Sequence, residues 1–281
     1  MESRPLRYFV AVAEELNFAR AAERLGISAP PLSRAIRKLE ADLGVTLLER
    51  STHSVALTAA GSVLLSEARG ALEALHAAGR RAQRASGPDA KLVLAVKADG
   101  YGGLLDTILA RFAADPAARP VTIRLSGWGE QVHLLRQGEA DAALVYDPFD
   151  STDLDTEPIF VEPRQAVLPA AHPLAARDRL TLADLALPGV EPGNLAGLGQ
   201  YLDSTVEQHG FIDLAQLLAH VELGDLVTLL PESVTVRYPR PGVVYRPVVD
   251  VAPATLSIAW PQKSCSVATA ALVRAATSVV A

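Results

Sequence analysis

Between residues 17 and 26, the hydrophobic positions follow the spacing of one short amphipathic helix. Apolar residues from Phe18 to Leu25 recur at intervals of three and four, as on one face of a helix. Asn17 stands at the expected N-cap, and Gly26 stands where a helix ends in a left-handed residue. We therefore expect a helix over residues 18–25, closed by a sharp turn.

A second amphipathic helix is expected directly after that turn. Ser28 can cap it, and prolines are tolerated in its first turn because the N–H groups there have no acceptor within the helix. The positions expected to face a core are Leu32, Ala35, Ile36, Leu39 and Leu43. The opposite face carries Pro30, Ser33, Arg34 and Arg37 and no acidic residue. Two helices arranged in this way predict a helix-turn-helix that reads DNA.

The side chains of the outward face suit the edges of base pairs. Arginine can donate two hydrogen bonds to guanine N7 and O6, so Arg34 is the first candidate for direct base readout. The apolar surfaces of Ala29 and Pro30 can touch a thymine methyl group, beside Ser33. The candidates for phosphate contacts, which position the protein without distinguishing sequences, are Arg37, Lys38 and Arg50. The alternative is that these are solvated charges on an ordinary helical domain.

A long helix is expected after Thr58, which can cap it, and it should reach about Ser86. Apolar residues follow one another along it at alternating intervals of four and three, namely Leu64, Ala68, Ala71, Leu75, Ala78 and Ala82. This seam predicts pairing with the same helix of a second subunit. Because the seam is short and rich in alanine, packing against its own domain stays an alternative.

From residue 92 onward, short β-rich runs alternate with helical patterns. Runs at 92–97, 121–126 and 142–146 enclose helical patterns at 100–114 and 128–137, which predicts a βαβαβ unit with parallel strands. The later runs at 166–169, 227–230, 243–247 and 256–260 predict a second, similar half. The tail is therefore expected to fold as two α/β lobes.

Charge is unevenly divided between the two parts. Residues 1–86 hold 12 Lys and Arg against 9 Asp and Glu, whereas the remainder holds 14 against 23. Only the front of the chain therefore suits a polyanion. This modest excess of positive charge argues against strong non-specific affinity for DNA.

The motifs of the front and of the tail resemble those of LysR-type transcriptional regulators. RPLRYFVAVAEELNFARAAERLGIS, PPLSRAIRKLEADLGVTLLERS and VALTAAG carry the resemblance over most of residues 4–61. In the tail it is looser and is carried by LLDTILARFAADP, LLRQGEADAALV, LGDLVTLLPESV, PGVVYRP and LSIAWP.

The resemblance implies an α+β multidomain architecture in three parts. A winged helix-turn-helix would occupy residues 1–58, with an extra first helix at residues 4–16 and a wing near residues 47–57. Residues 59–86 would form a linker helix that pairs subunits. Residues 87–281 would form a two-lobed, periplasmic-binding-protein-like effector domain. Its lobe I would comprise about residues 91–161 and 261–281, and its lobe II about residues 162–260.

Three departures from the family pattern bear on binding. The family commonly has glutamine where this chain has Ala29, basic residues in the wing where it has Thr52, His53 and Ser54, and phenylalanine where it has Leu48, the last being only a packing change. His53, the remaining wing candidate for a DNA contact, is charged only when protonated. We expect DNA binding with altered specificity or lower affinity. The chain between residues 209 and 221 is shorter than is usual, which suggests that lobe II is trimmed.

The resemblance also implies a ligand cleft between the lobes, formed by the loops that leave the strands. By position, its expected lining is Asp99, Gly100, Tyr101, Ser126, Gly127, Trp128 and Tyr146. Many family members have a hydroxyl where this chain has Asp99. If Asp99 faces the cleft, a neutral, hydroxylated or cationic effector is favoured over an organic acid; if it caps the following helix, it has no bearing on the ligand.

The function implied is that of a bacterial transcriptional regulator. Its expected partners are promoter DNA, further copies of the chain in a dimer or tetramer, and RNA polymerase as a further candidate. Two alternatives stay open: a DNA-binding regulator whose tail is only an oligomerisation scaffold, and a small-molecule carrier or enzyme. No catalytic triad, paired acids or nucleotide-binding motif supports catalysis, so an enzyme is not expected.

The remaining signals exclude several classes of protein. The six histidines have no metal-ligand spacing, so neither a metal nor a cofactor is expected. The single cysteine, Cys265, excludes an internal disulfide and is expected to be a small buried residue. No signal peptide or membrane span is visible, and a cytoplasmic location is expected.

Overall fold

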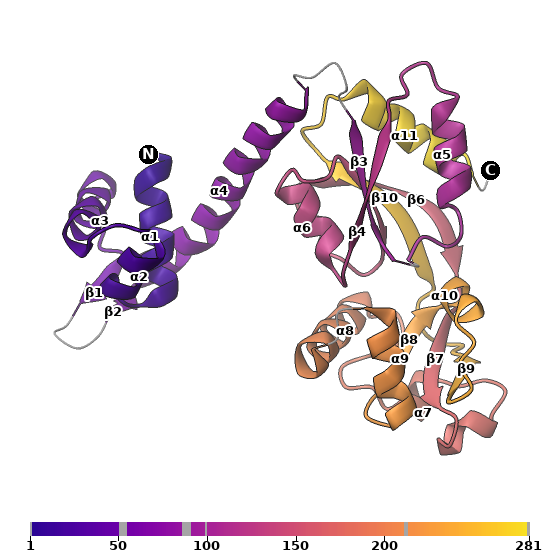
Figure 1. Ribbon diagram of the computed structural model, residues 1–281. Helices are drawn as coiled ribbons and strands as arrows, with labels where there is room; N and C mark the ends of the chain where they lie inside the picture. The colour runs from indigo at the N-terminus through magenta and orange to yellow at the C-terminus, as the bar shows by residue number, and fades with distance from the viewer. Residues whose placement is uncertain (1, 51–54, 86–90, 99, 211–212, 280–281) are drawn as a thin grey trace. The chain divides into compact units, whose positions relative to one another are not determined.

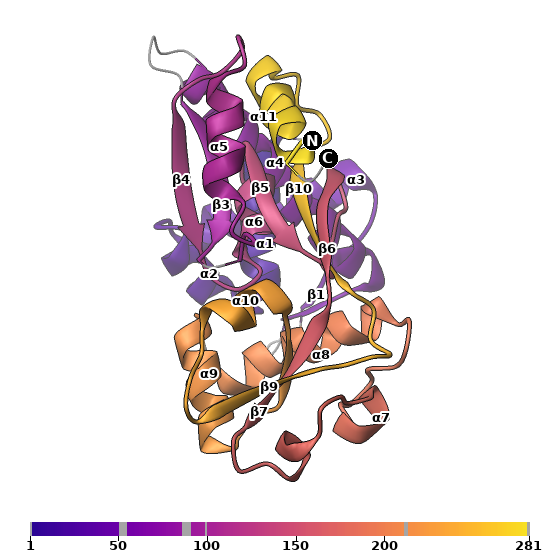
Figure 2. The same cartoon turned by 90° about the vertical axis from the view of Figure 1, so that its right-hand side faces the viewer.

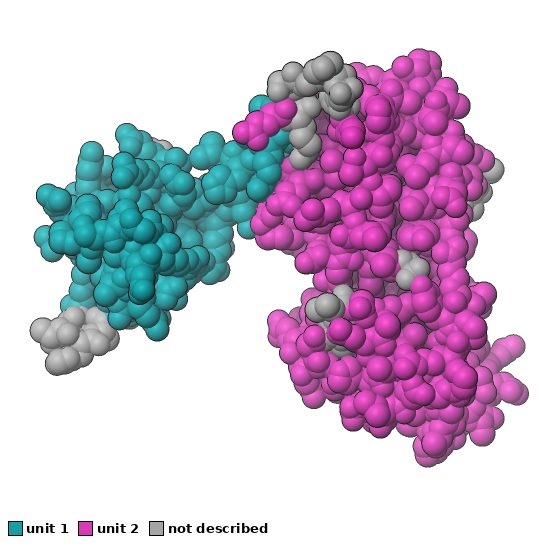
Figure 3. Space-filling view, in the orientation of Figure 1, with its two compact units in different colours: residues 1–82 teal, residues 83–281 magenta. Residues whose placement is uncertain are grey.

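The computed structural model describes residues 2–50, 55–85, 91–98, 100–210 and 213–279. Its contacts divide the chain into two compact units, residues 1–82 and residues 83–281 (Figure 3). The first unit is helical with a small hairpin, and the second is a mixed α/β unit with two lobes (Figure 1). The expected α+β multidomain architecture is confirmed.

The first unit is a helix-turn-helix followed by a wing and a long helix. Its helices are α1 (Ser3–Glu15), α2 (Phe18–Arg24), α3 (Ala29–Leu43) and α4 (Ala59–Ala85). The wing is the antiparallel pair β1 (Leu48–Arg50) and β2 (Val55–Leu57), in which Leu48 faces Leu57. The predicted helices and hairpin are confirmed to within one or two residues at each end.

The ends of these helices follow the capping rules in most places. The Asn17 side chain accepts hydrogen bonds from the backbone N–H groups of Ala19 and Arg20, and Gly26 has a φ of 65°. Thr58 Oγ1 accepts a hydrogen bond from Gly61 N at 2.9 Å, which caps α4. Ser28 occupies the N-cap position of α3, but its side chain makes no capping hydrogen bond, so that expectation was wrong.

Replacing Asn17 with alanine should lower the free energy of unfolding of the first unit by about 0.5–2 kcal/mol, because two N–H groups of α2 would lose their acceptor. Ser28→Ala is the matched control, since the Ser28 side chain satisfies no N–H group of α3. Denaturant unfolding followed by circular dichroism at helical wavelengths measures both. A loss of stability as large for Ser28→Ala would contradict the capping explanation.

Phe9, Leu32, Ile36 and Leu39 form the buried centre of the first unit, together with the small residues of α1 and α2. The apolar face predicted for α3 is thus confirmed at most positions. Ala35 is only half-buried, and Leu43 is the clear exception, because 41% of it is exposed. It is the last residue of α3 before Gly44, where the chain turns away from the core.

Lobe I of the second unit is built on a five-stranded sheet with the order β4-β3-β5-β10-β6. Its strands are β3 (Leu92–Lys97), β4 (Val121–Ser126), β5 (Ala142–Tyr146), β6 (Leu154–Glu162) and β10 (Ala254–Pro261). Strand β3 runs parallel to β4 and β5, as predicted, whereas β10 runs antiparallel to β5 and β6. The helices are α5 (Leu105–Ala113), α6 (Glu130–Arg136) and α11 (Val267–Thr277).

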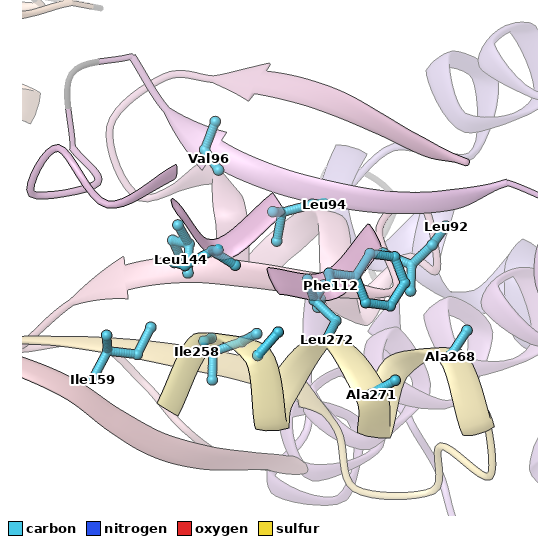
Figure 4. Close-up of a cluster of buried hydrophobic side chains, with 14 of the residues drawn as sticks. Leu92, Leu94, Val96, Phe112, Leu144, Ile159, Ile258, Ala268, Ala271 and Leu272 are labelled. Carbon is cyan, nitrogen blue, oxygen red and sulfur yellow. The ribbon is translucent and has the colours of Figure 1, made fainter. Parts of the chain in front are cut away.

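Helices α5 and α11 cover one face of this sheet (Figure 4). Phe112 and Leu272 from these helices pack against Leu94, Leu144 and Ile258 of the strands, and all five are essentially inaccessible to solvent. Helix α6 covers the other face with a separate apolar cluster that includes residues of β5 and β10. This burial on both faces makes the sheet a rigid platform for the loops at its carboxyl edge.

Lobe II is smaller and has a three-stranded antiparallel sheet with the order β8-β7-β9. Its strands are β7 (Arg164–Pro169), β8 (Thr228–Pro231) and β9 (Val243–Pro247). Its helices are η1 (Pro173–Ala176), α7 (Leu182–Leu185), α8 (Leu195–His209), α9 (Leu214–Leu223) and α10 (Glu232–Arg237). Two chain segments join the lobes, one from β6 to β7 and one from β9 to β10 (Figure 2).

Two expectations about this unit were wrong. The run at 256–260 belongs to β10 and completes the sheet of lobe I, so it is not part of lobe II, and lobe II is not a second copy of the first. The helical pattern at 100–114 begins as a helix only at Leu105, because Gly102 and Gly103 adopt left-handed backbone angles, with φ of 59° and 79°. These glycines shape the loop at the carboxyl edge of the sheet.

Candidate DNA-reading surface and effector cavity

Helix α3 presents a contiguous polar face to solvent, which we call the recognition face. Leu32, Ile36 and Leu39 hold the helix against the core and thereby turn the opposite side outward. The recognition face consists of Pro30, Ser33, Arg34, Arg37 and Lys38, of which only Ser33 is half-buried. Ala29 at the start of the helix packs partly against the core. The geometry agrees with the sequence analysis, and the DNA contacts themselves stay predictions.

Arg50 in the wing is already engaged within the unit. Its guanidinium donates to Glu40 Oε2 at 2.8 Å and lies 4.9 Å from the centre of the Phe18 ring. The other oxygen of Glu40 accepts hydrogen bonds from the backbone N–H groups of Leu47 and Leu48. Arg50 therefore joins the wing to α2 and α3, so only its remaining N–H groups are left for a phosphate. His53, the other wing candidate, lies outside the described residues.

The predicted seam of α4 divides into two parts. Leu64 packs against the core of the first unit, and Ala68 is buried. The other four positions, Ala71, Leu75, Ala78 and Ala82, are exposed. The start of α4 therefore packs against its own unit, which was the alternative to pairing between subunits. The later seam positions remain exposed apolar surface.

A cavity of about 320 Å³ lies between the two lobes of the second unit. The wall from lobe I is polar and aromatic and includes Lys97, Trp128, Gln131, Arg136 and Phe149. The wall from lobe II is mainly aliphatic and includes Leu202, Leu214, Leu229, Leu230 and Val234, with two charged residues, Arg164 and Asp203. A cavity of this size fits a small organic molecule.

Of the expected cleft residues, Gly100, Trp128 and Tyr146 line this cavity. Tyr101 is not among the lining residues; its ring lies under the Arg237 guanidinium. Ser126 and Gly127 are also absent from the lining, because Ser126 Oγ donates to Val96 O at 3.1 Å and Gly127 N donates to Glu130 Oε2 at 2.6 Å. Asp99 lies outside the described residues, so its two interpretations stay open.

Trp128 is held in place by a lysine from the neighbouring strand. Lys97 Nζ lies 3.2 Å from the centre of the Trp128 ring, in a cation–π contact near the amino end of α6. Both residues line the cavity. A ligand would therefore meet the ammonium group together with the indole.

The sequence analysis missed a buried arginine at the junction of the lobes. Arg164, at the start of β7, is only 2% exposed and lines the cavity. Its guanidinium donates to the carboxylate and the carbonyl oxygen of Asp147, and to Ala252 O at 3.1 Å. Burial lowers the pKa of the Arg164 guanidinium, and the Asp147 carboxylate opposes that shift. The signal was available in part, because a charged residue stands just before the apolar run at 166–169.

A buried carboxylate, Glu162, lies on the other side of Pro163 from Arg164. Glu162, which is 4% exposed, accepts hydrogen bonds from the Tyr146 hydroxyl of lobe I and from the backbone and hydroxyl of Ser233 in lobe II. Burial, and then the hydrogen bond to Glu162, raise the pKa of Tyr146, which therefore stays a neutral donor. Glu162 thus connects Tyr146 of lobe I with Ser233 of lobe II through hydrogen bonds.

Other chemistries find little support in the described part of the chain. Within it, no group of three or more His, Cys, Asp or Glu side chains is placed to hold a metal ion. Cys265 is exposed, so the expectation of a buried thiol was wrong. No helix in the described ranges combines the length and the apolar character needed to cross a bilayer.

Comparison with known families matches both parts of the chain. Residues 3–62 match the bacterial regulatory helix-turn-helix proteins of the lysR family, and residues 85–281 match the LysR substrate binding domain. The hca operon transcriptional activator HcaR of Escherichia coli is 35% identical over 272 residues, which span 92% of this chain and 92% of HcaR. The regulator BudR of Raoultella terrigena is 33% identical and covers 92% of this chain and 94% of its own length.

Solved structures of full-length regulators agree with these matches. The crystal structure of CbnR, a LysR family transcriptional regulator, aligns over 100% of both chains with a TM-score of 0.62 and 26% identity. Full-length CbnR in complex with its target DNA aligns with a TM-score of 0.58 and 26% identity, over 99% of this chain and 100% of CbnR. The chain therefore belongs to the LysR family of bacterial transcriptional regulators, with an N-terminal DNA-binding helix-turn-helix domain and a C-terminal effector-binding domain.

Proposed function

We propose that this regulator binds promoter DNA by inserting α3 into the major groove, with Arg34 reading a base edge. The observation that carries the proposal is the exposure of Arg34, Arg37 and Lys38 on a helix that has no Asp or Glu from Ala29 to Leu39. A cationic helix of this kind fits a major groove, and the duplex bound by CbnR supports the comparison. Arg50 would add a phosphate contact through the N–H groups that Glu40 leaves free.

Mobility-shift titrations of the full chain with the DNA upstream of its own gene, at several salt concentrations, test this proposal. Specific binding should weaken as salt rises, with a slope set by the number of phosphates that are neutralised. A scrambled duplex of equal length serves as the control. Equal affinity for both duplexes, or no binding at low salt, would contradict the proposal.

We also propose that two copies of the chain pair through the exposed part of the α4 seam. Leu75, which is 53% exposed, is the largest apolar side chain in that part. The alanines on either side of it allow two helices to approach closely. Pairing would present two recognition faces to successive half-sites.

Changing Leu75 to glutamate should weaken self-association at least several-fold, because a charge would be buried in the pairing surface. Sedimentation velocity over a concentration series measures the effect. Ala74→Glu, on the same helix but outside the seam, is the matched control and is itself exposed. If both variants associate like the parent chain, pairing through the seam is wrong.

The effector proposed for the cavity is a small molecule with one polar side and one apolar side. Its polar side would face Lys97 and Gln131 of lobe I, and its apolar side would face Leu202 and Leu229 of lobe II. The described lining residues carry three positive and three negative charges. The positive ones are Lys97, Arg136 and Arg164, and the negative ones are Asp147, Asp150 and Asp203. Because Arg136 and Arg164 are already paired with aspartates, the cavity offers no surplus of cations to an organic acid.

Calorimetry with matched pairs of small carboxylic acids and their amides tests this ligand class. At least one uncharged member should give a saturable heat, and its acid should bind no more tightly. Tight binding by acids alone would reverse the proposed class. If no compound in a broad metabolite panel binds, the tail is better described as an oligomerisation scaffold.

We propose a regulatory role without a catalytic step. The two curated relatives described above are transcriptional regulators. The polar groups of the cavity bond one another in pairs, such as Arg164 with Asp147 and Arg136 with Asp150. These pairs suit binding rather than proton transfer.

A further inference from the structure

Helix α10 of lobe II lies at the junction with lobe I (Figure 2). Its first residue is fixed to the connection between the lobes, because Glu232 N donates to Pro163 O at 3.0 Å. The Glu232 carboxylate accepts a hydrogen bond from Gln165 Nε2 at 2.9 Å. The amino end of α10 is thus held on the β6–β7 connection.

The next residue reaches lobe I directly. Ser233 Oγ donates to Glu162 Oε1 at 2.8 Å and lies 3.2 Å from the Tyr146 hydroxyl at the end of β5. The Ser233 backbone N–H donates to the other oxygen of Glu162. One buried carboxylate therefore receives donors from both lobes.

The last residue of α10 makes a second contact with lobe I. The Arg237 guanidinium carbon lies 5.5 Å from the centre of the Tyr101 ring. The guanidinium also lies directly against Gly103, where an added Cβ would overlap it. The absence of a side chain at Gly103 is what lets the Arg237 guanidinium approach this turn so closely.

We propose that α10 is a latch that holds the two lobes of the effector-binding domain together without a bound ligand. Ser233 and Arg237 are its two contacts with lobe I. The cavity borders the latch, because Tyr146, Pro231 and Val234 line it. A ligand shifts the equilibrium between latched and open lobes only by its difference in affinity for the two forms. That regulatory consequence rests on the proposed effector binding, whereas the latch itself does not.

Distance measurement between two spin labels on the full chain tests the latch. The first label is placed on Cys265, which is exposed in lobe I and is the single cysteine of the sequence. The second is placed on the exposed position of lobe II created by Asp178→Cys. Dilution with an excess of unlabelled Cys265→Ser chain removes distances between subunits. Double electron–electron resonance then reports the separation of the lobes in the absence of DNA and ligand.

The parent chain should give a dominant narrow distance population and a minor population at longer distance. Arg237→Ala should raise the ratio of open to latched lobes about 2- to 5-fold, as expected for loss of an exposed cation–π contact. Ser233→Ala should raise it about 10-fold or more, because a hydrogen bond to a buried carboxylate is lost. The double variant should show a clear second population at longer distance. Arg240→Ala is the matched control, since Arg240 pairs with Glu222 inside lobe II.

Unchanged distances in the double variant and in both single variants would overturn the latch. A shift of the same size in Arg240→Ala would overturn it as well. If the double variant does not fold, Arg237→Ala carries the test, because Arg237 is exposed and its loss leaves the core intact. Failure here leaves the mobility-shift and calorimetry results untouched, so the two proposals fail separately.

Discussion

Replacing Arg164 with alanine should lower the free energy of unfolding of the effector-binding domain by about 3–5 kcal/mol. The substitution would leave Asp147 without its cation, and the nearby Glu162, which is 4% exposed, would lose a stabilising positive charge. An unpaired buried charge is far more destabilising than an absent pair. Three hydrogen bonds made by the guanidinium would be lost at the same time.

Urea unfolding followed by tryptophan fluorescence measures this loss in the full chain. Both tryptophans, Trp128 and Trp260, lie in the second unit, so the signal reports on that unit alone. Arg136→Ala is the matched control: Asp150, its partner, is 63% exposed at the side chain, so the change should be at most about 1 kcal/mol. Arg164→Met keeps much of the volume and should still destabilise strongly. Equal effects of Arg164→Ala and Arg136→Ala would show that burial of the pair is not the cause.

Replacing Arg34 with alanine should weaken binding to the cognate promoter by about 1–3 kcal/mol, or roughly 5- to 150-fold. The expected cause is the loss of two hydrogen bonds to one guanine. Binding to a scrambled duplex should change much less, because phosphate contacts do not depend on the base sequence. Fluorescence anisotropy at one fixed salt concentration, with both duplexes, gives the two affinities.

Lys38→Ala is the matched control for Arg34→Ala, since both side chains are exposed on the recognition face. Loss of Lys38 should weaken binding to every duplex about equally and reduce the salt slope by about 1. If Arg34→Ala behaves in the same way, Arg34 is a phosphate contact. A variant of Arg34 that binds both duplexes like the parent chain would remove α3 from the proposed interface.

Local patterns were sufficient for the first unit because its elements depend on neighbours in the sequence. Asn17 caps the start of α2 through N–H groups two and three residues away, and Gly26 adopts a left-handed conformation just after the end of α2. The recognition face follows from helical spacing alone. Leu43 shows the limit of that reasoning, because spacing places it on the apolar side while the chain turns away after Gly44.

The cavity was predictable only in outline. Position after a strand placed Gly100, Trp128 and Tyr146 correctly at the cavity, since carboxyl ends of parallel strands share one edge. The same rule failed for Ser126 and Gly127, whose polar groups turn to Val96 and Glu130. Arg164 and the leucines of lobe II were missed, because they reach the cavity from segments far along the chain.

By itself, the sequence determined the helix-turn-helix, the recognition face, the long helix α4 and the existence of two α/β lobes. These features arise from interactions within one turn or one strand, which periodicity reports directly. Only the tertiary structure decided that β10 completes lobe I, that Arg164 and Glu162 are buried side by side, and that α10 touches Tyr101 and Tyr146. The contacts of α10 with Tyr146 and Tyr101 join residues 87 and 136 positions apart, and no local pattern constrains which distant partners such residues will meet.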